Sequence, residues 1–239
     1  MTLQRGSSIL FIVGCNKIDY NKNIIIGEII MKIAVVAANG KAGQAIVEEA
    51  LKRGLDVTAI VRSKNKSKAN KVIEKDLFDL TKEDLSDFDV VVDAFGAWSE
   101  DQLHLHSVSQ KHLADLLSGT EKRLMIVGGA GSLYINPEHT VQLVDTPEFP
   151  EIFKPLANAQ RQTLAEIRER KDVKWTFVSP AADFQADGQR SGHYILAGEE
   201  FTVNDNGQST ISYADYAIGF VDEIENGRHI QERISLIGK

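Results

Sequence analysis

Two glycines placed three residues apart, Gly40 and Gly43, are the residues best suited to bind a ligand. They lie between an apolar, strand-like run and a helix-like segment. Glycines at such a turn let the backbone approach a pyrophosphate, and the helix N-terminus offers free N–H groups with a partial positive charge. Ala37 occupies the first glycine place of a G-x-x-G-x-x-G pattern. The expected cofactor-binding residues of this dinucleotide site are Asn39, Gly40, Lys41, Ala42 and Gly43.

The charge at the end of the second strand-like segment indicates which dinucleotide is bound. About twenty residues beyond the glycines, an Asp or Glu would bind the ribose of NAD. The sequence has Arg62 in this region, followed by lysines at positions 64, 66 and 68. A guanidinium can stack on adenine and pair with a 2′-phosphate. We therefore expect the cofactor to be NADP (NADPH), with NAD as the alternative, and we interpret most of the lysines as a solvated loop.

No metal site is expected from the histidines. His104 and His106 are two residues apart within a predicted helix, so their side chains should point to different faces. We interpret both as surface histidines. The single cysteine, Cys15, cannot form an internal disulfide.

The elements that must position these residues alternate along the chain, which is typical of a parallel sheet covered by helices on both faces. The expected strands are 32–37, 56–61, 71–75, 89–94, 123–127 and 175–179, and the expected helices are 41–53, 103–117 and 153–170. In the tail, short β-prone pieces at 194–196 and 210–211 precede a helix at 213–225 and a strand at 233–237. Ser212 and Asp215 fit a capping box for that helix. The predicted fold is an α/β doubly wound parallel sheet of the Rossmann type with a small C-terminal appendage on the substrate side.

Charge and hydropathy limit the partners of the protein. The net charge of -7 over 239 residues argues against a nucleic-acid footprint and against binding to an anionic membrane surface. No apolar run approaches the length of a membrane span. We expect a cytoplasmic protein, monomeric or homodimeric, whose partner is a small-molecule substrate.

The first thirty residues are expected to lie outside the core. Met31 opens the first strand directly, so the single NAD(P)-binding domain 31–239 needs nothing before it, and we interpret residues 1–30 as a leader or extension. A lipoprotein signal ending at Cys15 is one alternative. Its apolar run is short, and only one basic residue precedes that run. An additional N-terminal strand or helix is the other alternative.

Several motifs together give the chain from Met31 onward a family resemblance. They are Asn39–Gly43, Val61–Arg62, Lys75–Asp79, Asp93–Gly96, Val127–Ser132 and Ser179–Ala182. With these motifs, the chain resembles the atypical short-chain dehydrogenase/reductases of the NmrA-like group, among them bacterial proteins described as NADH-flavin reductases. The resemblance implies further cofactor-binding residues: Asp76 and Leu77 beside the adenine, Ala94, Phe95 and Gly96 under the ribose and pyrophosphate, and Val127, Gly128, Pro180 and Ala181 at the nicotinamide. Sheet packing is the alternative role for the apolar positions.

One motif of the wider family is missing. Its catalytic members use a Tyr-x-x-x-Lys pair, in which the lysine lowers the pKa of the tyrosine so that it can transfer a proton. No tyrosine of this chain has a lysine four residues later, and Phe153–Ala157 stands where the pair would align. Alcohol oxidation through that relay is therefore not expected. Flavin or quinone reduction needs no relay, because hydride can pass directly to an electron-poor ring and the proton can come from water.

The candidate catalytic residues are Ser132 and Tyr134, in the loop after the expected strand 123–127. Ser132 would donate a hydrogen bond near the substrate, and a simple turn serine is the alternative. Trp98 is expected either to stack on a flat ring or to pack in a lid.

The predicted function is an NADPH-dependent reductase of flavins, quinones or similar planar acceptors, with flavin as a substrate. The alternative is a non-catalytic NADP-binding redox sensor that acts through a protein partner. The missing proton relay is compatible with both functions. It disfavours a nucleotide-sugar epimerase or dehydratase, as does the short C-terminal portion.

Overall fold

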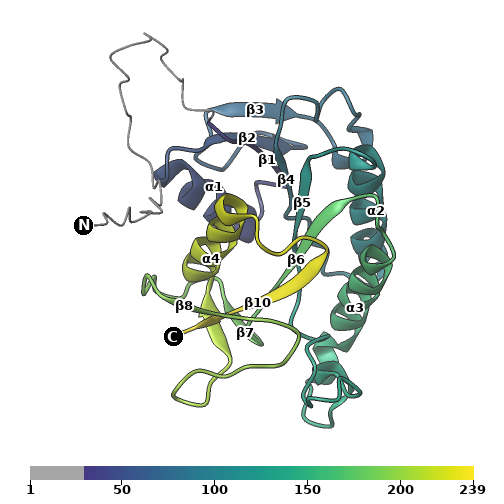
Figure 1. Ribbon diagram of the computed structural model, residues 1–239, viewed down its shortest axis with the longest axis vertical. Coiled ribbons are helices and arrows are strands. Elements are labelled where there is room, and N and C mark those ends of the chain that lie inside the picture. The colour runs from purple at the N-terminus through teal and green to yellow at the C-terminus, as the bar shows by residue number, and fades with distance from the viewer. Residues whose placement is uncertain (1–29) are drawn as a thin grey trace, which may run out of the picture. The chain divides into compact units, whose positions relative to one another are not determined.

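An eight-stranded sheet forms the centre of residues 30–239, the part of the chain that this computed structural model describes (Figure 1). The strand order is β3-β2-β1-β4-β5-β6-β10-β8. Its strands are β1 (Lys32–Val36), β2 (Asp56–Val61), β3 (Lys71–Glu74), β4 (Val90–Asp93), β5 (Arg123–Val127), β6 (Lys174–Pro180), β8 (Tyr194–Ala197) and β10 (Glu232–Gly238). Neighbouring strands pair in parallel except β8, which is antiparallel to β10. The expected doubly wound, Rossmann-type α/β fold is confirmed.

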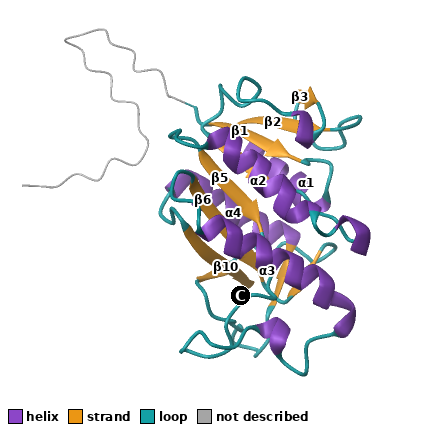
Figure 2. Ribbon diagram, turned by 90° about the vertical axis from the view of Figure 1, so that its right-hand side faces the viewer, coloured by secondary structure: helices purple, strands orange, loops and turns teal. Residues whose placement is uncertain are grey.

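Four α-helices cover the two faces of this sheet in the described residues (Figure 2). They are α1 (Lys41–Lys52), α2 (Leu105–Leu117), α3 (Lys154–Arg168) and α4 (Tyr213–Asn226). Helices α1 and α4 pack against each other on one face, and α2 and α3 on the other. Strand β1 is buried from both sides, because Ile33 and Val35 face the first core while Ala34 and Val36 face the second. This explains its uninterrupted apolar run.

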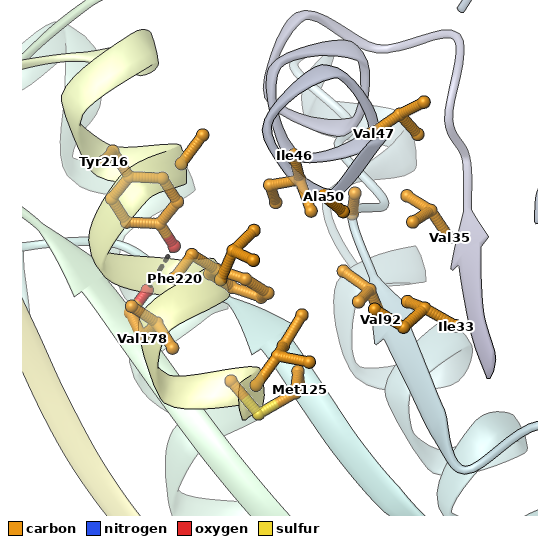
Figure 3. Close-up of a cluster of buried hydrophobic side chains, with 14 of the residues drawn as sticks. Ile33, Val35, Ile46, Val47, Ala50, Val92, Met125, Val178, Tyr216 and Phe220 are labelled. Carbon is orange, nitrogen blue, oxygen red and sulfur yellow. Dashed lines mark hydrogen bonds between the residues drawn. The ribbon is translucent and has the colours of Figure 1, made fainter. Parts of the chain in front are cut away.

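The core under α1 and α4 fixes both helices to the strands (Figure 3). Ile46 and Val47 of α1 pack in the same cluster as Val35 of β1. From α4, the fully buried Tyr216 donates a hydrogen bond of 2.8 Å from its hydroxyl to the carbonyl of Val178. The start of α4 is therefore fixed beside the carboxyl end of β6.

The order of the strands defines where a ligand is expected. The chain moves outward from β1 through β2 to β3 and then returns to β4 on the other side of β1. In such open sheets ligands bind outside the carboxyl ends of the strands, at the point where the order reverses. The segment after β6 adds β7 (Asp183–Gln185) and β9 (Thr210–Ser212), which form a separate two-stranded sheet at this end.

The expected elements are present, with ends shifted by a few residues at most. The strand β7 was not expected, and a 3-10 turn at Glu151–Phe153 replaces the start of the predicted helix 153–170. The capping box is confirmed, since Oγ of Ser212 accepts from the N–H of Asp215 at 3.0 Å. Within residues 30–239, no helix is long and apolar enough to cross a membrane. The interpretation of residues 1–30 falls almost entirely outside the described residues and stays a prediction.

Candidate functional site

A cavity of about 750 Å³ opens at the carboxyl ends of the central strands. It extends from the loops after β2 and β3, past the turn after β1 and the loop after β4, to β5, α3, β7 and α4. Most of the predicted cofactor-binding residues line it: Asn39, Gly40, Lys41, Ala42, Arg62, Asp76, Leu77, Ala94, Phe95, Gly96, Val127 and Gly128. Segments far apart in the sequence thus meet at one site.

The turn after β1 points the N-terminus of α1 at the cavity. Gly40 is the N-cap, no side chain caps the helix, and its first turn has no acidic residue. The first N–H groups of a helix have no partner within it, so they are free for an anion. A Cβ on Gly40 would lie 3.4 Å from the carbonyl oxygen of Ala37, an ordinary contact, whereas a Cβ on Gly43 would lie 2.9 Å from Cα of Ala38. Gly40 is therefore not required by packing within the chain, while Gly43 serves the close packing of helix on strand and does not line the cavity.

Ala37 opens the same turn in a strained conformation. Its φ is 57°, in the left-handed region that favours glycine. Its carbonyl accepts from the N–H of Gly40 at 3.0 Å. The missing first glycine therefore has a cost, of about 1–2 kcal/mol, and the turn keeps the conformation that a glycine would adopt.

Asn39 fastens this turn to the loop after β2. Its Oδ1 accepts from the N–H of Lys66 at 2.7 Å, and its Nδ2 donates to the carbonyl of Lys64 at 3.1 Å. The loop carries Arg62, whose side chain lines the cavity and forms no ion pair within residues 30–239. Lys68, by contrast, pairs with Glu48 at 2.9 Å. Lys64, Lys66 and Lys68 are all exposed, in agreement with the solvated-loop interpretation, and Lys66 also lines the cavity.

This end of the cavity is cationic although the chain as a whole is acidic. The positively charged lining residues are Lys41, Arg62, Lys66 and Lys75. Asp76 is the only carboxylate among the lining residues of the described chain, and its Oδ1 accepts from the N–H of Phe78 at 3.0 Å. An anionic ligand with a hydrogen-bonding base would fit this distribution of charge.

A buried carboxyl group lies behind the centre of the cavity. Asp93 ends β4, between β1 and β5, and only 4% of its surface is exposed. Its Oδ1 accepts from the N–H of Phe95 at 3.0 Å. Burial raises the pKa of Asp93 to about 6. The carboxyl group is therefore partly protonated in mildly acidic solution.

His106 corrects the interpretation of both histidines as surface residues. His104 is exposed, but His106 is buried and lines the cavity. Its Nε2 lies 3.3 Å from the N–H and 3.1 Å from the carbonyl oxygen of Ala97, and the tautomer decides which of the two it bonds. Burial lowers the pKa of His106, so the ring is neutral at pH 7. The sequence contained a signal for this, because His106, Gln110 and Leu113 follow the spacing of one buried helix face.

The far end of the cavity is formed by α3 and the C-terminal appendage. Leu156 and Gln160 of α3 line it, four residues apart, whereas Phe153 and Ala157, where the missing tyrosine and lysine were expected to align, do not. Phe184 and Tyr213 also line it, with ring centroids 3.8 Å apart. The sequence did not indicate either contact, because Phe184 belongs to β7, a strand that was not predicted, and Tyr213 is only the first residue of the predicted helix α4. Trp98, predicted as a stacking or lid residue, lines the cavity and is 75% exposed.

The two candidate catalytic residues do not line the cavity. Ser132 is 3% exposed, and its Oγ lies 3.4 Å from Nη1 of the buried Arg233. Tyr134 stacks on His139 with ring centroids 4.6 Å apart. The loop after β5 turns away from the ligand side because Arg233 and the chain near Glu199 hold it there. We therefore do not assign catalysis to either residue.

Pro180 and Ala181, expected at the nicotinamide, do not line the cavity either. Both are buried, Pro180 as the last residue of β6 and Ala181 with 1% of its surface exposed. Their burial agrees with sheet packing, the alternative role given for these apolar positions.

Comparison with known proteins agrees with this geometry. A model of the NAD(P)H-binding family matches residues 37–226. The uncharacterized protein YwnB of Bacillus subtilis is 45% identical over 212 residues, which cover 87% of this chain and 99% of YwnB. The solved structure of a proposed NADH-flavin reductase from Streptococcus pneumoniae is 62% identical with a TM-score of 0.86, covering 87% of this chain and 100% of the other.

A second solved structure has a different description. A proposed epimerase from Bacteroides thetaiotaomicron is 34% identical with a TM-score of 0.77, covering 87% of this chain and 97% of the other. Similarity to these proteins therefore supports the fold and the NAD(P)H site, and the reaction has to be inferred from the residues of this chain.

Proposed function

We propose that this chain, which belongs to the NAD(P)H-binding family, is an NADPH-dependent reductase that delivers hydride to a planar acceptor such as a flavin or a quinone. The cavity is the observation that carries this proposal. One end combines an uncapped helix N-terminus with cationic side chains, and the other end combines aromatic rings with Leu156 and Gln160 in place of a proton relay.

The residues of the first end fit a phosphorylated dinucleotide. The side-chain-free backbone at Gly40 and the free N–H groups of α1 would receive the pyrophosphate. Arg62 would pair with the 2′-phosphate, since a guanidinium offers several donors to phosphate oxygens. Asp76 would accept from the amino group of the adenine through the oxygen that Phe78 does not use. NADPH is accordingly proposed over NADH.

The residues of the second end determine which reactions are feasible. When bound, NADPH supplies a hydride, and a flavin or quinone ring accepts it without prior loss of a proton. Leu156 cannot transfer a proton, and the amide of Gln160 can only orient a substrate through hydrogen bonds. His106 is neutral and holds the backbone of Ala97. Binding and orientation would therefore supply most of the rate acceleration.

NADPH consumption with a panel of flavins and quinones tests the proposal. We expect oxidation of NADPH, followed at 340 nm, with at least one acceptor of each ring type, at rates well above those without protein. Binding of NADPH and NADP⁺ by calorimetry without consumption of NADPH would instead indicate the sensor function. No heat with either nucleotide at millimolar concentration would remove both functions.

The role of Arg62 is tested by cofactor preference. In Arg62→Gln we expect the affinity for NADPH to fall about tenfold, because one charge-assisted hydrogen bond to the phosphate is lost. The affinity for NADH, which lacks that phosphate, should change less than about twofold. Lys64→Gln is the matched control, because it removes the same charge from the same loop at a side chain that does not line the cavity. Equal losses for both nucleotides in Arg62→Gln would contradict the assignment.

A further inference from the structure

The two ends of the cavity differ in charge as well as in shape. All charged lining residues belong to the glycine turn after β1 or to the segments after β2 and β3. The lining side chains of the opposite end are Leu156, Gln160, Phe184, Ala186 and Tyr213, which carry no charge. Trp98, in the loop after β4, and the neutral His106 of α2 also line the cavity without a charge at pH 7. A charged group on an acceptor would meet no opposite charge there, and burying it unpaired would be unfavourable.

Aromatic rings dominate the same end. Phe184 and Tyr213 form a close pair, and Phe184 also packs on the buried Tyr216 at a centroid distance of 4.8 Å, which fixes the pair from behind. Trp98 leaves most of its indole exposed at the cavity, with Nε1 3.9 Å from the position of a Cβ on Gly96. Flat faces of this kind bind planar rings by stacking.

Two uncharged polar groups remain available for hydrogen bonds. Tyr213 and Gln160 line the cavity, and neither the hydroxyl of Tyr213 nor the side-chain amide of Gln160 forms a hydrogen bond within residues 30–239. Burial raises the pKa of Tyr213, so its hydroxyl stays protonated and able to donate. Gln160 reaches this place because Gly129 has no side chain, since a Cβ there would lie 1.8 Å from Oε1 of Gln160. Both groups can donate to the carbonyl oxygens of an acceptor.

We infer that the acceptor is an uncharged fused-ring compound with carbonyl oxygens, namely a quinone or an unphosphorylated isoalloxazine, and that acceptors carrying phosphate or sulfonate are used poorly. This inference rests on the proposed reductase function and specifies its substrate class. Reduction of a quinone consumes one hydride from NADPH and one proton from water, and yields the hydroquinone and NADP⁺. Trp98, Phe184, Tyr213 and Gln160 are the specificity-determining residues.

Matched acceptor pairs test the inference with the wild-type protein. Riboflavin and FMN share one ring and differ by a phosphate, and 1,4-naphthoquinone and its 2-sulfonate differ by the sulfonate. We expect kcat/KM for the neutral member of each pair to be about tenfold higher or more, which corresponds to about 1.4 kcal/mol. This order would hold although the sulfonate makes the quinone easier to reduce. Equal or higher kcat/KM for FMN and the sulfonate would overturn the inference and leave the reductase function intact.

A charge-introducing variant makes the test specific to the site. In Gln160→Lys we expect FMN to equal or exceed riboflavin, because the new ammonium group would pair with the phosphate. Gln162→Lys is the control: it adds the same charge to the same helix at an exposed position outside the cavity, and the preference for riboflavin should persist. An unchanged preference in Gln160→Lys would contradict the location of the acceptor.

A binding experiment separates failure of this inference from failure of the proposed function. Flavin fluorescence is titrated with protein saturated with NADP⁺, so that no turnover occurs. We expect quenching of riboflavin at protein concentrations about tenfold lower than for FMN, and loss of that quenching in Trp98→Ala but not in Phe153→Ala, which removes an exposed aromatic ring outside the cavity. If no acceptor oxidises NADPH, the reductase function fails. Even in that case the fluorescence titration tests the preference for uncharged acceptors. Equal binding of riboflavin and FMN, or binding of neither, overturns the inference.

Discussion

Two glycine-rich turns face the same end of the sheet and need their glycines for different reasons. After β1, a Cβ on Gly40 would lie 3.4 Å from the nearest atom, the carbonyl oxygen of Ala37, which is an ordinary contact. After β5, a Cβ on Gly128 would lie 2.0 Å from the ring of Phe177, and a Cβ on Gly131 would lie 2.6 Å from Cβ of Ala157. Packing within the chain therefore requires Gly128 and Gly131 but not Gly40, although both Gly40 and Gly128 line the cavity.

This difference shows why a glycine motif alone is a weak predictor of a binding site. Both turns follow a parallel strand, and both are equally visible in the sequence as Gly40–Gly43 and Gly128–Gly131. Only the atoms that surround each missing Cβ distinguish a glycine that ligand binding requires from a glycine that folding requires.

The largest expected effect lies in the second turn. We expect Gly128→Ala to lower the free energy of unfolding by about 2–3 kcal/mol, because the new methyl group overlaps Phe177 in a packed core. Urea denaturation measures this loss, and the double variant with Phe177→Leu should lose less than the sum of the single variants. Gly198→Ala is the control, since a Cβ there has no atom within 4 Å. Equal stability of Gly128→Ala and Gly198→Ala would contradict the packing argument.

Strand β4, which lies between β1 and β5, contains Asp93, and we expect its titration to change the free energy of unfolding by about 2 kcal/mol. Because the folded pKa of Asp93, about 6, lies above its ordinary value of 3.8, its contribution to stability is greatest below pH 4 and is lost as the pH rises through 6. We expect the stability of wild type relative to Asp93→Asn to fall by about 2 kcal/mol between pH 4 and pH 7. Denaturation at several pH values measures it, with Asp79→Asn at an exposed position as control. A pH-independent difference between wild type and Asp93→Asn would refute the burial effect.

The first turn should show the opposite behaviour to the second. In Gly40→Ala we expect the affinity for NADPH to fall about tenfold or more, because the methyl group occupies the space that a pyrophosphate needs. The free energy of unfolding should change by less than about 1 kcal/mol, the effect of a poorer N-cap. Calorimetry and urea denaturation on the same preparation measure both quantities. A large loss of stability with unchanged affinity would place Gly40 in the same class as Gly128.

The smallest expected effect concerns the contact between the first turn and its neighbouring loop. We expect Asn39→Ala to weaken NADPH binding about fivefold and NADH binding less than about twofold, because loss of the two hydrogen bonds releases the loop that carries Arg62. Asn65→Ala is the matched control, since its amide bonds Ala69 and Ser67 in the same loop at 2.9 Å, away from the cavity. Similar changes in both variants would show that Asn39 stabilises the loop without selecting the cofactor.

Much of the fold and one end of the site could be predicted from the sequence. The apolar run Ile33–Val36 predicted the first strand of the sheet, and Gly40 with Arg62 marked two segments that end at the same edge of a parallel sheet. These predictions depend on local periodicity and on the fixed geometry of parallel strands, in which carboxyl ends meet.

The other end of the cavity depended on packing between distant segments. Ser132 was predicted near the substrate, but the buried Arg233, one hundred and one residues later, holds it away from the cavity. His106 was expected at the surface and is buried against Phe95 at a centroid distance of 5.6 Å. A residue's distance along the chain from the glycine turn gives no measure of its distance from the ligand.

The sequence by itself determined the order of the elements, the parallel sheet and the cationic end of the cavity, because these follow from patterns within single segments. Only the tertiary structure decided that Trp98, Gln160, Phe184 and Tyr213 line the same cavity. Those side chains come from a loop, a helix and the C-terminal appendage, and their meeting depends on how α3 and α4 pack on the sheet. No pattern within any one segment encodes that packing.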